Sequence, residues 1–168
     1  MSKGDWVRSP LERVGFVGWV PWSSCPASLT VIDRRSGGVY VIYRAGPLEP
    51  RYLDGSPGGR FRGDPSVSQE VLKANWVPGA RVIYIGKGKH GRLRKRLEEF
   101  VGFGRGGEHR HWGGRLIWQL DRSEELLVAW RTLPAEIDPA VVEKEMIVAF
   151  RADYGKPPYA NDPHRLGH

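Results

Sequence analysis

The chain has 168 residues, of which 40% are hydrophobic, and a formal net charge of +7 at pH 7. This length predicts one domain with a core of ordinary size. The single cysteine, Cys25, excludes an internal disulfide and a thiolate-rich zinc site, so redox chemistry has no support. There is no run of about eighteen apolar residues and no apolar signal-peptide core, which predicts a soluble, cytoplasmic protein without a membrane partner.

The positive charge is concentrated in one segment. Residues 79–115 contain ten Lys or Arg against three Glu, so the rest of the chain carries no net charge. A basic excess confined to one segment, next to a glycine-rich loop, is typical of a site for a polyanion. The alternative interpretation is a basic helix face that is simply exposed to solvent.

The first half of the chain contains one clear strand. Residues 1–35 are interpreted as an arm without regular structure, apart from a candidate strand at 29–33, and its tryptophans are expected to pack on the domain. The β-rich segment 37–44 predicts a strand. Residues 45–80, rich in Gly, Pro and Asp, are interpreted as an insertion with a short helix, for which Ser66 has capping-box spacing.

The basic segment begins with a predicted strand at 81–85 and the loop 86–92. An amphipathic helix follows, and its apolar stripe has helical spacing and consists of Leu93, Leu97, Phe100 and Val101. The glycine-rich stretch 102–115 resists assignment. A short helix around 116–120 and a third strand at 125–133 come after it.

The last helix has clear signals at both ends. Asp138 is the expected N-cap, Pro139 the first helical residue, and Gly155 the terminator. Three strands and several helices, with a long insertion between the first two strands, predict an α+β domain. We expect a small three-stranded antiparallel sheet flanked by helices.

Two tripeptides on the predicted strands carry the clearest functional signal, and they read Gly38-Val39-Tyr40 and Tyr84-Ile85-Gly86. An ordered set follows them, made up of Lys87, Leu93-x-x-Arg96-Leu97, a histidine near position 111, Glu143 and Asn161. Together with the order of elements, this combination resembles the GIY-YIG endonucleases. The resemblance covers residues 36–161 and leaves 162–168 as a C-terminal tail.

The resemblance implies metal-dependent hydrolysis of a nucleic-acid phosphodiester. It makes Tyr40 the general base or the group that orients the attacking water, with Lys87 or the metal expected to lower its pKa. Tyr84 is the second tyrosine of the implied site, and Asn161 is expected to hydrogen-bond within it. Glu143 is the implied ligand of one Mg²⁺ or Mn²⁺ ion. The alternative is that both tyrosines are ordinary strand aromatics.

Helical spacing leaves two candidate carboxylates on the last helix. Glu143 and Glu145 border opposite edges of an apolar stripe that consists of Met146, Ile147 and Phe150. The family pattern, two apolar residues and then Glu, favours Glu143. A salt bridge on the helix surface is the alternative for either.

The amphipathic helix offers two arginines for the scissile phosphate. Arg94 and Arg96 flank the apolar stripe at nearly equal angles, so periodicity does not choose between them. The family's usual spacing from Gly86 favours Arg94, whereas its Leu-x-x-Arg-Leu helix pattern favours Arg96. We prefer Arg96, because a surface loop tolerates an insertion better than a helix tolerates a rotation of its faces. Its guanidinium is expected to stabilise transition-state charge.

His109 and His111 stand in the glycine-rich stretch. A zinc site is disfavoured because neither a second cysteine nor a second histidine pair has structural-zinc spacing. The resemblance implies a histidine near the substrate, with His111 preferred and His109 as the alternative. The side chains predicted to contact nucleic acid are Lys89, His90, Arg92, Arg94, Lys95, His109 and Arg115.

The expected partner is DNA, with RNA as the alternative, and a homodimer is one way to cut both strands of a duplex. The competing function is a non-catalytic nucleic-acid-binding module on the same scaffold. The complete set of motif residues argues against that function, because binding alone needs no carboxylate near the phosphates.

Overall fold

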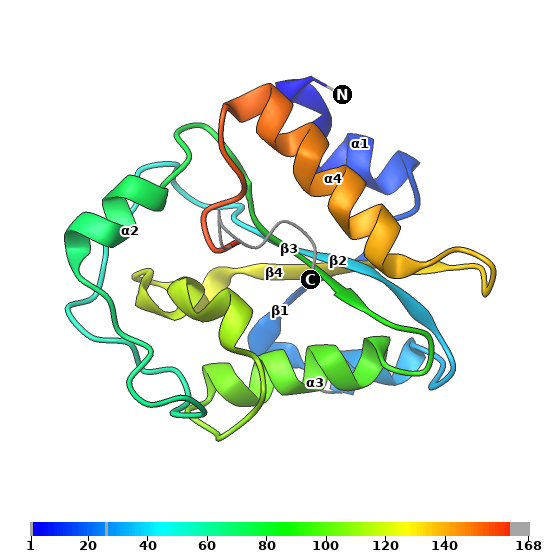
Figure 1. The fold of residues 1–168 in the computed structure, drawn as a ribbon, viewed down its shortest axis with the longest axis horizontal. Helices are drawn as coiled ribbons and strands as arrows, with labels where there is room; N and C mark the ends of the chain where they lie inside the picture. Colours follow the sequence, from blue (N-terminus) through cyan, green and yellow to red (C-terminus); the bar gives the residue numbers. More distant parts are fainter. Residues whose placement is uncertain (1, 26, 162–168) are drawn as a thin grey trace.

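The computed structural model describes residues 2–25 and 27–161, and the predicted tail at 162–168 lies outside them. Helices cover both faces of a four-stranded antiparallel sheet (Figure 1). The predicted α+β class is confirmed. The strands are β1 (Val17–Pro21), β2 (Gly37–Tyr43), β3 (Val82–Gly88) and β4 (Leu127–Leu133).

The order of the strands makes β1 and β3 the edges of the sheet. The order is β1-β4-β2-β3, and all neighbouring strands are antiparallel. The strands predicted at 37–44, 81–85 and 125–133 correspond to β2, β3 and β4, although β3 continues to Gly88. The expected count of three strands is wrong, because β1 in the N-terminal arm pairs with β4.

The α-helices are α1 (Arg8–Arg13), α2 (Gln69–Asn75), α3 (Leu93–Gly104) and α4 (Pro139–Tyr154). Short 3₁₀ helices lie at Lys3–Trp6, Trp22–Ser24, Ala27–Val31, Trp112–Gln119 and Ser123–Glu125. Both end signals of α4 are confirmed: Asp138 Oδ1 accepts from the Ala140 amide at 2.8 Å, and Gly155 has φ of 84°. Within the described ranges, no helix combines the length and apolarity needed to cross a membrane.

The N-terminal arm is more ordered than the sequence predicts. The candidate strand at 29–33 is wrong, because Ala27–Val31 is a 3₁₀ helix in which the Thr30 hydroxyl donates to the Ala27 carbonyl at 2.9 Å. Strand β1 escapes sequence patterns because it is short and interrupted at Trp19, which has φ of 55° beside a shift of register. Such a bulge removes the alternation of apolar residues.

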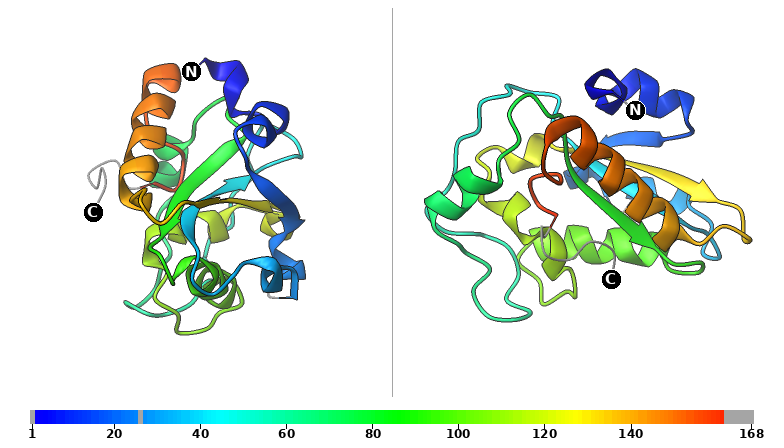
Figure 2. Two further views of the ribbon diagram at one scale, coloured as in Figure 1. Left: turned by 90° about the vertical axis from the view of Figure 1, so that its right-hand side faces the viewer. Right: turned by 45° about the horizontal axis from the view of Figure 1, so that its top comes forward.

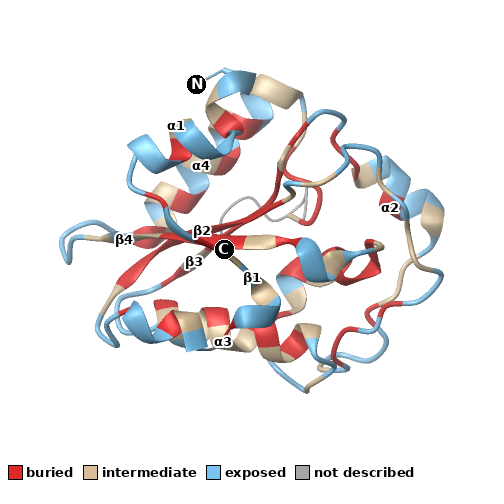
Figure 3. Cartoon of the chain, turned by 180° about the vertical axis from the view of Figure 1, so that it is seen from behind, coloured by how far each residue is buried: buried red, intermediate tan, exposed pale blue. Residues whose placement is uncertain are grey.

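The sheet separates two hydrophobic cores. One core contains α3, and the Tyr40 and Ile42 side chains of β2 point into it. The other core contains α4 and the arm residues between 6 and 19, and the side chains of β2 that face it are Val39, Val41 and Tyr43. Figure 2 shows α3 and α4 on opposite sides of the sheet, and Figure 3 shows buried residues along the strands and the inner helix faces. A site shared by α3 and α4 can therefore form only beyond an edge of the sheet.

A buried side-chain amide is one of the links between the insertion at 45–80 and the rest of the domain. The Gln119 Oε1 atom accepts from the Val67 amide at 2.7 Å, while Nε2 donates to the carbonyls of Val67 and Leu53 at 3.1 and 3.3 Å. The insertion helix α2 starts from Ser68, whose side chain accepts from the amide of Val71. Ser66 is not its cap, because the hydroxyl of Ser66 accepts from the Ser56 amide instead.

The arm should contribute strongly to stability through Trp6. This side chain is fully buried, packs edge-on against Phe150 of α4 at 5.0 Å, and donates to Asp153 Oδ2 at 2.7 Å. Trp6→Ala should lower the free energy of unfolding by about 3–5 kcal/mol, measured by urea denaturation. The control Val31→Ala, at a side chain that is 77% exposed on the same arm, should change it by less than about 0.5 kcal/mol. Equal urea midpoints for the two variants would contradict this role of the arm.

Candidate active site

The ring of Tyr40 crosses the neighbouring strand at a glycine. Tyr40 on β2 pairs directly with Gly86 on β3. A Cβ atom at Gly86 would lie 2.4 Å from Tyr40 Cζ and 2.6 Å from its hydroxyl oxygen, closer than real Cβ contacts. The absence of a side chain at Gly86 therefore lets the phenol reach across β3, and the two tripeptides fit together as one packing unit.

The Tyr40 hydroxyl meets His111 in a fully buried contact. The distance from Tyr40 Oη to His111 Nε2 is 2.7 Å, and both side chains have no exposed surface. Burial, and then the positive charge of Arg96, lower the pKa of His111 well below its usual value. A neutral imidazole has one donor and one acceptor nitrogen, so the direction of this hydrogen bond depends on the tautomer. Nδ1, the other ring nitrogen, is buried and has no hydrogen-bond partner among the described residues. Phe100 of α3 packs edge-on against the imidazole at 5.0 Å.

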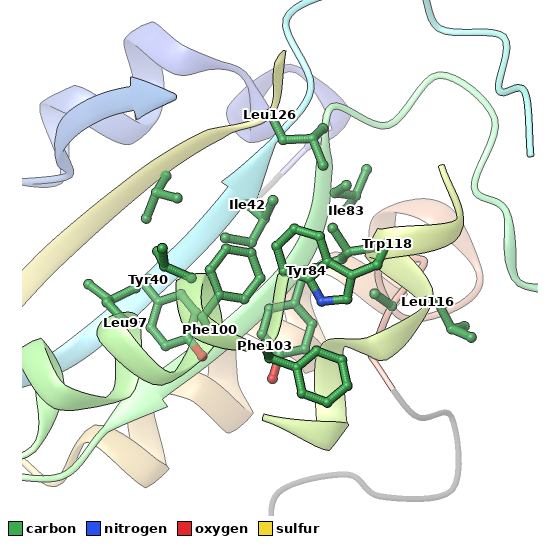
Figure 4. Close-up of a cluster of buried hydrophobic side chains, with 14 of the residues drawn as sticks. Tyr40, Ile42, Ile83, Tyr84, Leu97, Phe100, Phe103, Leu116, Trp118 and Leu126 are labelled. Carbon is green, nitrogen blue, oxygen red and sulfur yellow. The ribbon is translucent and has the colours of Figure 1, made fainter. Parts of the chain in front are cut away.

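Tyr84 lies beside this pair. Its ring centroid is 6.0 Å from that of Tyr40, and a Cβ atom at Gly113 would lie 3.3 Å from its hydroxyl oxygen. Figure 4 shows both tyrosines in the hydrophobic cluster beside α3. Burial raises the pKa of Tyr84, and it raises the pKa of Tyr40 well above the usual value, with Arg96 opposing both shifts. The structure thus differs from the expectation for Lys87: the cation that lowers the phenol pKa is Arg96, and burial outweighs it.

The structure places Arg96 rather than Arg94 at the tyrosines. Arg96 Nη1 donates to Glu99 Oε2 at 3.1 Å and to the carbonyl oxygen of Arg110. Its charge acts on the pKa values of Tyr40, Tyr84, His111 and Glu143. Arg94 forms an ion pair with Glu98 at 3.0 Å within α3 instead. Periodicity could not separate the two arginines, whereas these contacts do.

Glu143 approaches from the other face of the sheet. It lies on α4, is only 8% exposed, and accepts a hydrogen bond from Lys87 Nζ. Burial raises the pKa of Glu143, while Lys87 and then Arg96 oppose that shift. The rival carboxylate, Glu145, is exposed. The charge of Arg96 thus acts on Glu143 although their helices, α3 and α4, cover opposite faces of the sheet.

Asn161 joins the chain end to the second tripeptide. Its Nδ2 donates to the Ile85 carbonyl at 2.8 Å, and its Oδ1 accepts from the Ile85 amide at 2.9 Å. The adjacent Ala160 amide donates to the Ile83 carbonyl at 2.9 Å. The Asn161 side chain therefore occupies the outer edge of β3, where a neighbouring strand would otherwise pair.

The residues predicted to contact nucleic acid differ in their exposure and in their local partners. Those that are exposed are Lys89, His90, Arg92, Lys95 and His109, and Arg115 is partly buried. His109 packs against the backbone of Gly102 and Gly107, so it does not share the position of His111. The ring of His90 contacts the Ile137 carbonyl at 2.9 Å, and Arg92 pairs with Glu99 at 3.2 Å.

Three residues at the site were missed by sequence reasoning. Glu99 holds both Arg92 and Arg96, and the i, i+3 spacing from Arg96 could have indicated it. Arg110 acts through its backbone carbonyl, which no pattern of side chains predicts. Gly113 leaves room for the Tyr84 hydroxyl, and one glycine among many gave no signal.

The donor set fits a metal ion that arrives together with a phosphate. In the described parts of the chain, no group of three or more His, Cys, Asp or Glu side chains could hold a metal. Mg²⁺, however, is often held by one or two carboxylates, substrate phosphates and water. Glu143 supplies one such carboxylate, so the residues fit a single Mg²⁺ or Mn²⁺ ion shared with substrate.

Comparisons with protein-family models, curated proteins and solved structures found no match to this chain. Support for a function therefore comes from the residues of the site themselves.

The buried imidazole should leave a signature in the pH dependence of stability. The pKa of His111 in the fold is well below 6.5, its ordinary value, so below pH 6.5 the unfolded chain binds a proton that the native chain does not. Stability is therefore lost as pH falls, with a slope approaching about 1.4 kcal/mol per pH unit from this group. His111→Gln should remove that slope between pH 6.5 and 5.

Urea denaturation at several pH values measures this difference. His109→Gln, which changes an exposed imidazole in the same segment, is the matched control and should retain the wild-type slope. A wild-type slope in His111→Gln as well would show that another group is responsible.

Proposed function

We propose that the chain is a metal-dependent endonuclease of the GIY-YIG type that hydrolyses DNA phosphodiester bonds. The observation that supports this proposal is the buried cluster of motif side chains: Tyr40 contacts His111 at 2.7 Å, Arg96 acts on the pKa values of both tyrosines, and Glu143 pairs with Lys87. Hydrolysis of a phosphodiester needs these groups, since it requires a cation for the phosphate and an anion for a metal.

The Tyr40 and His111 pair would handle the proton of the attacking water. Tyr40 has no exposed surface in this structure, so the mechanism requires water to enter beside its hydroxyl together with the substrate. That water transfers a proton to Tyr40 Oη while the phenol proton passes to the unprotonated Nε2 of His111. The water oxygen forms its bond to phosphorus, the bond to the departing sugar oxygen breaks, and that oxygen takes a proton from solvent. The hydrogen bond of 2.7 Å supports proton transfer between these two atoms, and the raised pKa of Tyr40 means that it acts as a relay and not as a stored phenolate. Because the pKa of His111 is lowered, its imidazole would hold the proton only transiently.

Arg96, and Glu143 through a metal ion, would stabilise the negative charge of the transition state. Arg96, held by Glu99, would donate to the phosphate oxygens that gain negative charge. Glu143 would hold a Mg²⁺ or Mn²⁺ ion, which when bound offsets charge on the phosphate and on the departing oxygen. Lys87 would leave the carboxylate of Glu143 and turn to the substrate. RNA is the alternative substrate in this proposal, and a homodimer is one way in which the protein would cut both strands of a duplex.

One observation favours a second candidate, a nucleic-acid-binding module without catalysis. Lys87 Nζ donates directly to Glu143, so it takes up the carboxylate that a metal would need. In that alternative the ion pair is permanent and ties α4 to β3. Metal-dependent cleavage of DNA distinguishes the two functions.

Supercoiled plasmid incubated with purified protein and Mg²⁺ or Mn²⁺ should be nicked or linearised, and EDTA should prevent this. Glu143→Gln should reduce the cleavage rate by about 10²-fold or more, because it removes the negative charge that holds the metal. Glu145→Gln, on the exposed side of the same helix, should cleave like the wild type. Equal rates for the two variants would refute the role of Glu143, and intact plasmid with every metal would favour the binding module.

A parallel comparison tests whether Arg96 or Arg94 is the arginine that acts on the phosphate. Arg96→Ala should lower single-turnover cleavage at saturating enzyme by about 10²- to 10³-fold, since it withdraws a charged donor from the transition state. Arg94→Ala removes an arginine of the same helix that is paired with Glu98, and it should mainly weaken DNA binding. A larger loss of rate in Arg94→Ala than in Arg96→Ala would reverse the assignment.

A further inference from the structure

The segment 110–113 forms one wall of the candidate site. Arg96 donates to the carbonyl of Arg110, His111 contacts Tyr40, and Gly113 faces the hydroxyl of Tyr84. Side chains that project from this segment therefore stand next to the position proposed for the scissile phosphate.

Two partly buried aromatic residues stand at this wall. Trp112 directly follows His111, and the guanidinium of Arg115 lies 5.2 Å from the centroid of its ring. Phe61, in the insertion, has the guanidinium of Arg110 at 5.8 Å and that of Arg62 also at 5.8 Å. Both rings are thus paired with cations, in contrast to Trp118, which is fully buried and packs against Phe100 and Trp22.

The position of Phe61 is fixed by close backbone packing. The Gly59 amide donates to the Phe103 carbonyl at the end of α3 at 2.8 Å. A Cβ atom at Gly59 would lie 1.9 Å from the Gly107 carbonyl oxygen, so the insertion lies directly on the glycine-rich stretch. This contact presents Phe61 to Arg110 as part of a defined surface.

We infer that Phe61 and Trp112 are stacking platforms for unpaired bases, and that the substrate is therefore nucleic acid with single-stranded nucleotides at the cleavage site. This inference rests on the proposed nuclease function, and it narrows the substrate of that nuclease to nucleic acid with unpaired bases. Aromatic rings surrounded by guanidinium groups are the usual means of binding single strands: bases stack on the rings and the cations contact the phosphates.

The geometry disfavours an intact duplex as the preferred ligand. In a duplex the faces of the bases are covered by their neighbours, so only phosphates and groove edges are accessible to side chains. Contact with phosphates would require the arginines but not the rings. Because Arg62 and Arg110 are exposed, either can move off the ring of Phe61 toward a phosphate and leave that face to a base.

The test measures binding without cleavage. Fluorescence anisotropy in EDTA would compare a labelled single-stranded DNA of about 20 nucleotides with a blunt hairpin duplex of similar length, closed by a non-nucleotide linker so that it has no unpaired bases, and with the same single strand as RNA. The wild type should bind the single strand more tightly than the hairpin. The comparison of single-stranded DNA with RNA identifies which sugar the protein prefers. Phe61→Leu and Trp112→Leu should each weaken single-strand binding by about 5-fold or more and leave hairpin binding within about twofold.

Three controls separate stacking from general loss of structure. Phe61→Tyr keeps the aromatic face and should bind like the wild type. Tyr154→Leu changes a partly buried ring that has Lys3 at 5.4 Å but lies at the C-terminal end of α4, and it should bind both nucleic acids normally. Circular dichroism confirms that each variant is folded.

Failure of the stacking inference and failure of the proposed nuclease function give different results. If the two leucine variants lose single-strand and hairpin binding equally, or lose neither, the stacking inference is wrong, whatever the protein cleaves. If the protein binds single strands through Phe61 and Trp112 but cleaves no nucleic acid with Mg²⁺ or Mn²⁺, the proposed nuclease function is wrong and the platforms belong to a binding module.

Discussion

The site depends on the crossing of the Tyr40 ring over Gly86. A phenol on β2, a central strand, reaches past its neighbour only because the directly opposed residue on β3 has no side chain. That crossing places the hydroxyl at His111 and fixes the ring beside Tyr84. The same contact requires a defined register between β2 and β3, since a shift of one residue would send every side chain to the other face. The register of β2 against β3 and the position of the Tyr40 hydroxyl therefore depend on the same steric condition, the absence of a side chain at Gly86.

Charged groups from both faces of the sheet come together near β3, its edge strand. Helices on opposite faces of a sheet are normally separated by its full thickness. Here the charge of Arg96 on α3 nevertheless lowers the pKa of Glu143 on α4. The cost is the burial of charged groups, and the structure offsets it with pairs: Lys87 with Glu143, and Arg96 with Glu99.

Sequence patterns predicted the elements whose periodicity or end signals are strong. Helix α4 begins after Asp138 and ends at Gly155 as expected, and the stripe of α3 packs into the core. Strand β1 could not be predicted, because its pairing with β4 is a long-range contact and its bulge at Trp19 hides the alternation. Among the site residues, the sequence left Arg94 and Arg96 equivalent. What separates them is a backbone carbonyl in a loop of irregular structure, which only the folded chain reveals.

The contacts of Asn161 also bear on self-association. An edge strand with unpaired amides and carbonyls is a template for another strand, and proteins cover such edges to avoid aggregation. Here the Asn161 side chain satisfies both backbone groups of Ile85, and Ala160 satisfies the carbonyl of Ile83. A second copy consequently cannot extend the sheet across these residues without first displacing Ala160 and Asn161. This turn therefore caps the edge strand, so that the same contacts that complete the backbone hydrogen bonds of β3 also prevent sheet-to-sheet association there.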